Sequence, residues 1–154
     1  MNLIDSIVPK GKIKLDFHNV VTDEHEIIFV DNLVTTVGKE SIADHLKGTT
    51  SNNKGIITYC ALGTDDTAPA LGDTALGTEI ERKEISVRSV SNNIASFQTF
   101  FTTSEAIGSL KEAGLFGDDA SDTADSGTLF CHAAIDREKS SNDTLTLTWT
   151  VAIG

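Results

Sequence analysis

The chain has 154 residues, enough for one domain whose core needs neither a disulfide nor a metal. Its formal net charge is -11, which argues against nucleic acid as a partner because phosphate binding needs clustered lysine and arginine. No apolar run approaches the roughly 20 residues that cross a bilayer, and residues 1–8 lack the basic region of a signal peptide. We therefore expect no membrane partner and a protein that stays in the cytoplasm where it is made, unless it leaves within an assembly.

The first expected segments are an N-terminal arm over residues 1–11 and a single domain over residues 12–154. Residues 12–17 alternate apolar and polar side chains, the period of a strand with one buried face. A second strand-like run covers residues 26–30, after a polar turn at 22–25. The two runs predict a β-hairpin.

The best helix candidate is Thr36–Leu46, where apolar residues recur at helical intervals. Thr36 is a suitable N-cap, and Gly48 stands where a glycine commonly ends a helix. Because the helix is short, we expect it to lie against one edge or end of a sheet. A strand is predicted over residues 56–62.

Residues 63–77 consist mainly of Gly, Thr, Asp and Ala, and they are long for a loop. This makes them a candidate contact loop. The next pair of strands, residues 84–90 and 94–103, is predicted to form a hairpin about a turn at 91–93. A further strand is expected at residues 110–116.

An acidic loop of small residues is expected over residues 118–127, and strands follow at 128–135 and 144–153. In the last strand, apolar residues share one face and threonines the other, so one face is buried and the other is wet or meets a partner. About eight short strands and one short helix predict a mainly β fold, a single-domain antiparallel β-sandwich of jelly-roll-like form.

The two cysteines, Cys60 and Cys131, lie in apolar strand-like runs and have no metal-ligand spacing. The sequence predicts buried free thiols that pack as small apolar groups. A disulfide stays open as an alternative if the two strands are neighbours.

No arrangement of residues indicates an enzyme. The histidines, His18, His25, His45 and His132, lie on different elements, so we expect neither a catalytic nor a metal site and no cofactor. Cys131 and His132 are neighbours on a strand and so point to opposite faces. The loop Asp118 to Asp125 could offer carboxylates to Ca²⁺, but it lacks the EF-hand order, and a solvated loop is the favoured interpretation.

Five stretches of the chain occur together in a recognisable order. They are residues 32–46 (NLVTTVGKESIADHL), 57–64 with 67–69 (ITYCALGT, TAP), 73–83 (DTALGTEIERK), 112–116 (EAGLF) and 142–151 (NDTLTLTWTV). In these stretches the chain resembles a group of small tailed-bacteriophage virion structural proteins, often labelled tail-fibre or structural proteins. The resemblance covers roughly residues 12–153 and implies a virion component made in the host cytoplasm, without giving its place on the particle.

Two functions follow from this resemblance. The first is capsid decoration, in which a cement protein stabilises the head by joining neighbouring capsid subunits, and the alternative is a tail-fibre, collar or baseplate module for host attachment. We expect other virion proteins as partners and a homo-oligomer, with a trimer as the expected form. The last strand stops one residue before the end of the chain, so we also expect no shaft or catalytic segment after it.

The candidate contact residues come from two segments. They are Leu3, Ile4, Ile7 and Val8 in the arm and Leu71 and Leu76 in the long loop. The alternative for each of them is that it packs back onto its own domain.

Overall fold

The structure is a computed structural model that describes residues 8–48 and 55–154. These residues form nine strands and one helix, so the predicted mainly β fold is confirmed. The elements are β1 (Lys10–Asn19), β2 (Glu24–Val34), α1 (Thr36–Leu46), β3 (Ile57–Gly63), β4 (Glu79–Glu84), β5 (Val87–Ser91), β6 (Ile94–Phe101), β7 (Gly108–Gly117), β8 (Thr128–Lys139) and β9 (Asp143–Ala152).

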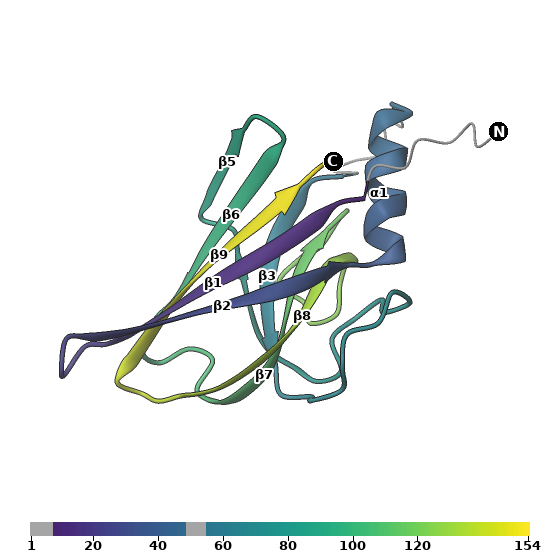
Figure 1. Ribbon diagram of the computed structural model, residues 1–154. Helices are drawn as coiled ribbons and strands as arrows, with labels where there is room; N and C mark the ends of the chain where they lie inside the picture. The colour runs from purple at the N-terminus through teal and green to yellow at the C-terminus, as the bar shows by residue number, and fades with distance from the viewer. Residues whose placement is uncertain (1–7, 49–54) are drawn as a thin grey trace.

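All the strands pair antiparallel in one curled sheet with the order β4-β3-β7-β8-β2-β1-β9-β6-β5 (Figure 1). The sheet folds at β2, which pairs with β1 over its length but with β8 only at Leu33 and Val34. Two layers result, which we call sheet A (β2-β1-β9-β6-β5) and sheet B (β4-β3-β7-β8). The fold is therefore sandwich-like, as the sequence predicted.

The two outer strands β4 and β5 are consecutive in the chain and belong to different layers. Ile85 and Ser86, between them, bridge the layers: the Ile85 amide donates to the Thr58 carbonyl at 2.8 Å and the Ser86 amide to the Gln98 carbonyl at 2.9 Å. The chain thus passes from sheet B to sheet A at this corner, opposite the corner formed by β2.

The core lies between the layers and is built by the alternation seen in the sequence. Sheet A supplies Leu145, Leu147 and Trp149 of β9, all fully buried, together with the apolar side chains of β1. The indole nitrogen of Trp149 donates to the thiol sulfur of Cys60 across the layers at 3.4 Å. The threonines of β9 lie on the other side of sheet A, so the predicted two faces of this strand are confirmed.

The helix has the predicted bounds, but its cap is Thr35 and not Thr36. The Thr35 hydroxyl accepts the Gly38 amide at 3.0 Å and donates to the Leu129 carbonyl at 2.5 Å. A β-carbon at Gly38 would lie 2.4 Å from the Phe130 carbonyl oxygen, so glycine lets the helix pack directly on β8. The helix therefore lies against the end of a strand, where the sequence placed it.

Both predicted hairpins are confirmed, β1–β2 and β5–β6. The second turns at Asn92 and Asn93, with φ of 54° at Asn92, a conformation that asparagine tolerates well. Strand β4 was missed. Strand β1 begins at Lys10, so the expected arm over residues 1–11 overlaps the first strand by two residues.

Candidate interaction surface

The outer face of sheet B is covered by the two long loops of the chain. The loop between β3 and β4, residues 64–78, brings Leu76 onto this face, and the loop between β7 and β8, residues 118–127, brings Ala120. They complete a second apolar cluster outside the main core, made of Ala61, Leu76, Phe116 and Leu129 with Tyr59 and Ala120 packed against it. Both loops therefore pack against the domain.

A buried ionic network holds the first of these loops. His132 of β8 contacts two carboxylates, Asp73 Oδ2 at 2.7 Å from Nδ1 and Glu112 Oε2 at 3.0 Å from Nε2. The Glu112 carboxylate, only 2% exposed, also accepts the amides of Gly77 at 2.9 Å and Thr78 at 2.8 Å. Two strands and one loop are thus joined through a single carboxylate.

The same network explains the electrostatics of Asp73. Burial raises the pKa of its carboxyl, but the Ala70 amide and His132 together outweigh burial and hold this pKa below its ordinary value. Both ring nitrogens of His132 face carboxylate oxygens. The predicted separation of Cys131 and His132 is confirmed, since Cys131 faces the core.

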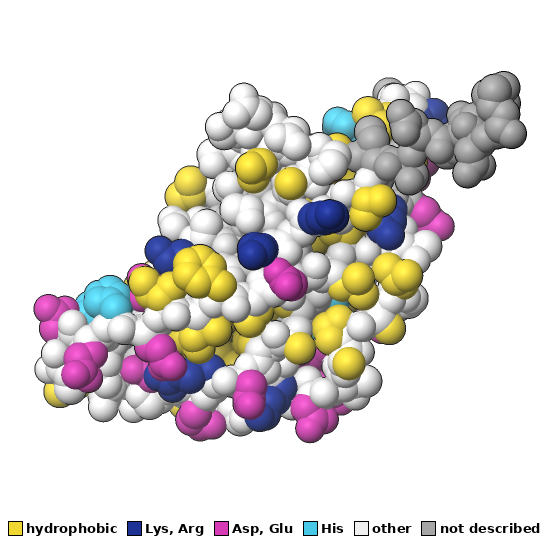
Figure 2. All heavy atoms as spheres, viewed as in Figure 1, with side chains coloured by type: hydrophobic (Ala, Val, Ile, Leu, Met, Phe, Trp, Pro, Cys, Tyr) yellow, Lys and Arg dark blue, Asp and Glu magenta, His cyan; other side chains and the backbone are white. Residues whose placement is uncertain are grey.

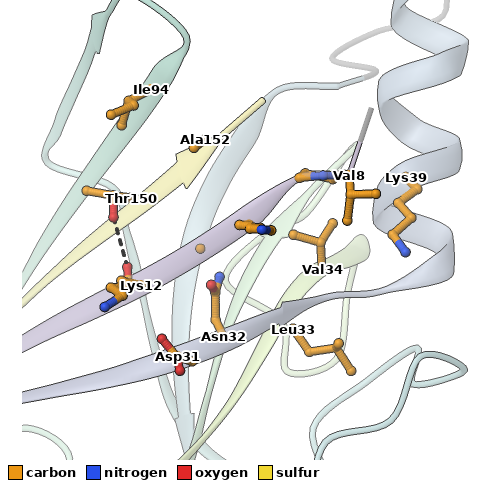
Figure 3. A pocket seen from close by; sticks show the side chains of 13 residues that line it. Val8, Lys12, Asp31, Asn32, Leu33, Val34, Lys39, Ile94, Thr150 and Ala152 are labelled. Carbon is orange, nitrogen blue, oxygen red and sulfur yellow. Dashed lines mark hydrogen bonds between the residues drawn. The ribbon is translucent and has the colours of Figure 1, made fainter. Parts of the chain in front are cut away.

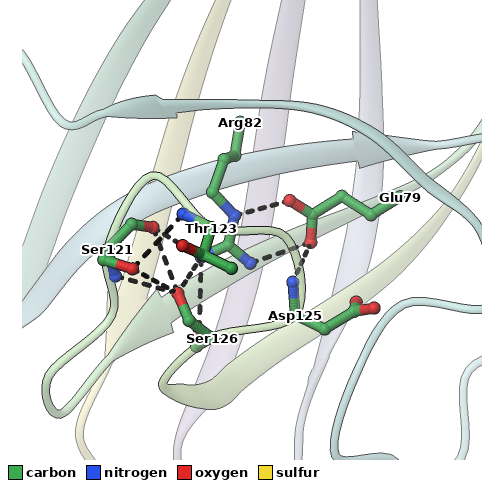
Figure 4. Close-up of polar contacts among 6 residues, drawn as sticks. All are labelled: Glu79, Arg82, Ser121, Thr123, Asp125 and Ser126. Atoms are coloured by element: carbon green, nitrogen blue, oxygen red, sulfur yellow. Dashed lines mark hydrogen bonds and ion pairs between the residues drawn. The ribbon is translucent and has the colours of Figure 1, made fainter.

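A second network holds the loop of residues 118–127 (Figure 4). Arg82 of β4 is buried, pairs with Glu79 and donates from Nη1 to the carbonyls of Ser121 at 2.9 Å and Ser126 at 3.2 Å. Its guanidinium carbon also lies 4.5 Å from the ring centre of Phe116. The Asp125 amide donates to the Glu79 carboxylate at 3.0 Å. The loop therefore wraps around the buried guanidinium group of Arg82.

The first acidic residue of this loop ties the loop to neighbouring segments. The Asp118 carboxylate accepts the Ser41 hydroxyl at 2.9 Å and the Gly55 amide at 2.6 Å. Burial and the nearby Glu79 carboxylate raise the pKa of Asp125 above its ordinary value. Two carbonyl oxygens of the loop, those of Ser121 and Ser126, accept hydrogen bonds from Arg82, which favours the structural interpretation of the loop.

The candidate contact residues lie in different environments in the structure. Leu76 is 5% exposed and packs within its own domain, which is a correction to its role as a contact residue. Leu71 is half exposed, and its carbonyl accepts the Thr36 amide at 2.8 Å, so it lies beside the start of α1. Val8 is also half exposed. Leu3, Ile4 and Ile7 lie outside the described residues.

The outer face of sheet A, unlike that of sheet B, carries no covering loop among the described residues. One row of side chains crosses all five strands in register: Phe29, Lys14, Thr148, Gln98 and Val87. Phe29 is 67% exposed and Val87 is 52% exposed, so large apolar side chains stand at both ends of the row. The sequence did not show whether the threonine face of β9 meets solvent or a partner. In the structure, no loop among the described residues covers this face.

A neighbouring row repeats this arrangement with Ile27, Asp16, Thr146 and Phe100. Figure 2 views the molecule from this side and shows a broad face in which white polar groups separate yellow hydrophobic patches. We call these two rows the sheet A face. Exposed aromatic and aliphatic side chains that gather on one sheet face are typical of a surface that meets another protein.

The sheet A face is bordered by an unpaired strand edge. Since β8 pairs with β2 only at Leu33 and Val34, residues 24–32 of β2 have no ladder partner on that edge among the described strands. A groove of about 480 Å³ lies along it, lined by residues that include Val30, Pro69 and His132. Arg137 of β8 reaches across toward β2, where its Nε donates to Glu26 at 2.6 Å.

A larger pocket of about 560 Å³ lies where β1 and β2 approach α1 (Figure 3). Val8, Val34 and Ala152 give it apolar walls, and Lys39 of the helix stands at its rim. The side-chain amide of Asn32 is buried here without a hydrogen-bond partner among the described residues. The pocket adjoins the sheet A face at the end of the sandwich where the N-terminal segment enters.

Comparison with known protein families, curated proteins and solved structures finds no match for this chain. Within the described residues, no helix has the length and apolar character that crossing a membrane requires.

Proposed function

We propose that the protein is a non-enzymatic structural component of a tailed-phage virion that decorates the capsid and binds its neighbours through the sheet A face. The observation that carries this proposal is the difference between the two sides of the sandwich. Sheet B is closed by two loops and two buried ionic networks, whereas sheet A presents Phe29 and Phe100 to solvent. The five resembling stretches supply the virion context.

The sheet A face suits a large, flat partner. One row crosses five strands and the other four. Their threonine and glutamine side chains can hydrogen-bond to a partner, and the apolar side chains at the row ends would become buried in the contact. A stable protein interface buries about 800 Å² on each partner, and a sheet of five strands offers an area of this order. The expected partner is the outer surface of the major capsid protein.

The loops favour the head over the tail as the site of attachment. A host-binding module presents mobile loops at one end of its scaffold, but here both long loops are fixed to sheet B through Glu112 and Arg82. A tail-fibre, collar or baseplate module stays the alternative, and copy number separates the two. A decoration protein approaches one copy, or a third of a copy, per capsid subunit, while a tail protein is present at a few copies per hundred.

The test combines stoichiometry with a surface variant. Particles of the phage that encodes the chain are purified, and the protein is quantified against the major capsid protein by mass spectrometry. Phe29→Glu replaces the most exposed apolar side chain of the two rows with a charge, at one end of its row, and is expected to reduce incorporation at least tenfold. Leu46→Glu is the matched control, because Leu46 is 81% exposed on α1, away from the sheet A face.

The expected result is a high copy number that falls with Phe29→Glu and persists with Leu46→Glu. A low copy number would contradict decoration, and absence from particles would contradict any virion role. Equal incorporation of both variants would show that the sheet A face is not the attachment surface. Thermal unfolding of both variants checks that the domain remains folded.

A further inference from the structure

The turn of the β1–β2 hairpin brings two histidines together that are seven residues apart in the sequence. His18 and His25 are directly opposite in the antiparallel ladder, with ring centres 4.2 Å apart and ring planes inclined by 6°. The hairpin extends beyond the body of the sandwich at the end far from α1 (Figure 1). The pair is therefore open to solvent and away from the main core.

Two carboxylates complete the cluster. Asp23, in the turn, places Oδ1 2.8 Å from His18 Nε2. One ligand atom from each of His18, Asp23 and His25 lies within 4.8 Å of the others. Two imidazoles and one carboxylate are a donor set that zinc and related divalent ions use in proteins.

Asp16 adds the orienting contact that metal-binding histidines commonly have. Its Oδ1 lies 2.8 Å from His25 Nδ1. A carboxylate that accepts the Nδ1 proton of a neutral histidine fixes the tautomer in which Nε2 carries the free lone pair. His25 is thus held by a neighbour on β1 in the form that coordinates a metal.

We propose that His18, His25 and Asp23 form a binding site for a divalent transition metal of the zinc class, with Asp16 as the positioning residue. Metal–nitrogen distances near 2.0–2.1 Å require donor atoms about 3.3 Å apart, so the two parallel rings tilt toward each other when the ion binds. Both histidines are at least partly exposed at the end of a hairpin, where side chains have room for this movement. The fourth position is left to water or to a group from a neighbouring molecule.

The charge of the protein supports a cation at this position. The formal net charge is -11, and Glu24 and Glu26 lie on the same strand as His25. Arg137 is the one cation that lines the adjoining cavity, and its Nε is paired with Glu26. A bound ion would join β1 to β2 at the end of the hairpin, where β2 has no ladder partner besides β1 among the described strands.

The test is calorimetric titration of Zn²⁺ into the full chain at pH 7.5, in a buffer that does not chelate metals and with the thiols kept reduced. We expect one site per chain. His18→Gln and His25→Gln should each weaken binding at least tenfold, and Asp16→Asn should weaken it by roughly 10- to 100-fold, as for other residues that orient a metal ligand. The control is His45→Gln, which removes an exposed imidazole on α1 and should bind as the unchanged protein does.

Nuclear magnetic resonance of the unchanged protein provides a readout that needs no variant. Zn²⁺ should shift the imidazole resonances of His18 and His25 and leave those of His45 and His132 in place. Absence of binding at millimolar Zn²⁺ would overturn the proposal. Unweakened binding in both His18→Gln and His25→Gln would likewise overturn it, because the ion would then lie elsewhere.

Discussion

Glu112 of β7 and His132 of β8 lie side by side under the loop of residues 64–78, with 3.0 Å between the carboxylate Oε2 and the imidazole Nε2. Both side chains are at least 95% buried, and each makes further polar contacts with that loop. The loop therefore depends on two strands of sheet B for its position. Replacing either residue tests this dependence.

Glu112→Gln is expected to destabilise the domain by about 1–3 kcal/mol, because glutamine offers one acceptor oxygen in place of the two that accept the Gly77 and Thr78 amides and face His132. Urea unfolding followed by tryptophan fluorescence measures the change in the free energy of unfolding. Limited proteolysis should show new cleavage within residues 64–78. Glu84→Gln, at an exposed carboxylate of β4, is the control and should change stability by less than about 0.5 kcal/mol.

Arg82→Met is expected to cost about 3–5 kcal/mol, since Glu79 would be left buried without its partner and two loop carbonyls would lose their donor. The double variant Glu79→Gln with Arg82→Met should recover about 0.5–3 kcal/mol of this loss. Chemical unfolding of the four proteins in the cycle gives the coupling. If the effects of Glu79→Gln and Arg82→Met on the free energy of unfolding simply add in the double variant, the result would contradict the proposed coupling of these two residues.

The stability of the domain should fall in acid through the carboxylates whose pKa the fold lowers. Burial raises the pKa of Asp143, but the amide and hydroxyl of Ser140 outweigh burial and hold it below the ordinary 3.8. The unfolded chain then binds more protons in this range, so the contribution is complete above pH 3.8 and is lost as pH falls through the folded pKa. Asp73 adds to this effect, whereas the raised pKa of Asp125 opposes it.

Unfolding free energies measured from about pH 6 to pH 2 check this expectation. Asp143→Asn should flatten the fall in stability below pH 4, because the titrating group is gone. A profile that is identical in both proteins would contradict the role assigned to Asp143.

Both thiols should be unreactive in the folded protein. Burial raises the pKa of Cys60 to about 12 and that of Cys131 well above its ordinary value, so neither is a thiolate at neutral pH. Each is paired in register with Leu115 of the strand between them, which places their backbones about 10 Å apart, too far for a disulfide. Reaction with a thiol-specific reagent should therefore proceed only at the rate of unfolding, and rapid reaction at pH 8 would contradict this.

Much of the fold was predictable because its strands carry a local signal. In β9, apolar and threonine side chains alternate without a break, and one face is buried as that pattern requires. Strand β4 gave no such signal. Its buried residues include Glu79 and Arg82, which stabilise each other in a charge network that a hydrophobic pattern cannot reveal.

The candidate sites depended on contacts between distant residues. His18 and His25 belong to different strands, and only the register of the hairpin places them opposite each other. The burial of Leu76 likewise follows from Phe116 and Leu129, far along the chain. Composition marked residues 63–77 as a contact loop, but it could not show that the contact is made with the loop's own domain.

The pairing of β1 with β9 along ten residues of each strand has a consequence for biosynthesis. These strands lie side by side near the middle of the curled sheet, yet they come from opposite ends of the chain, so closing that contact carries a large loop-closure entropy. Domains rich in such non-local pairings fold in milliseconds to seconds. On the ribosome, sheet A stays incomplete until residue 152 has left the exit tunnel, and until then β1 and β6 expose edges that other nascent chains can join.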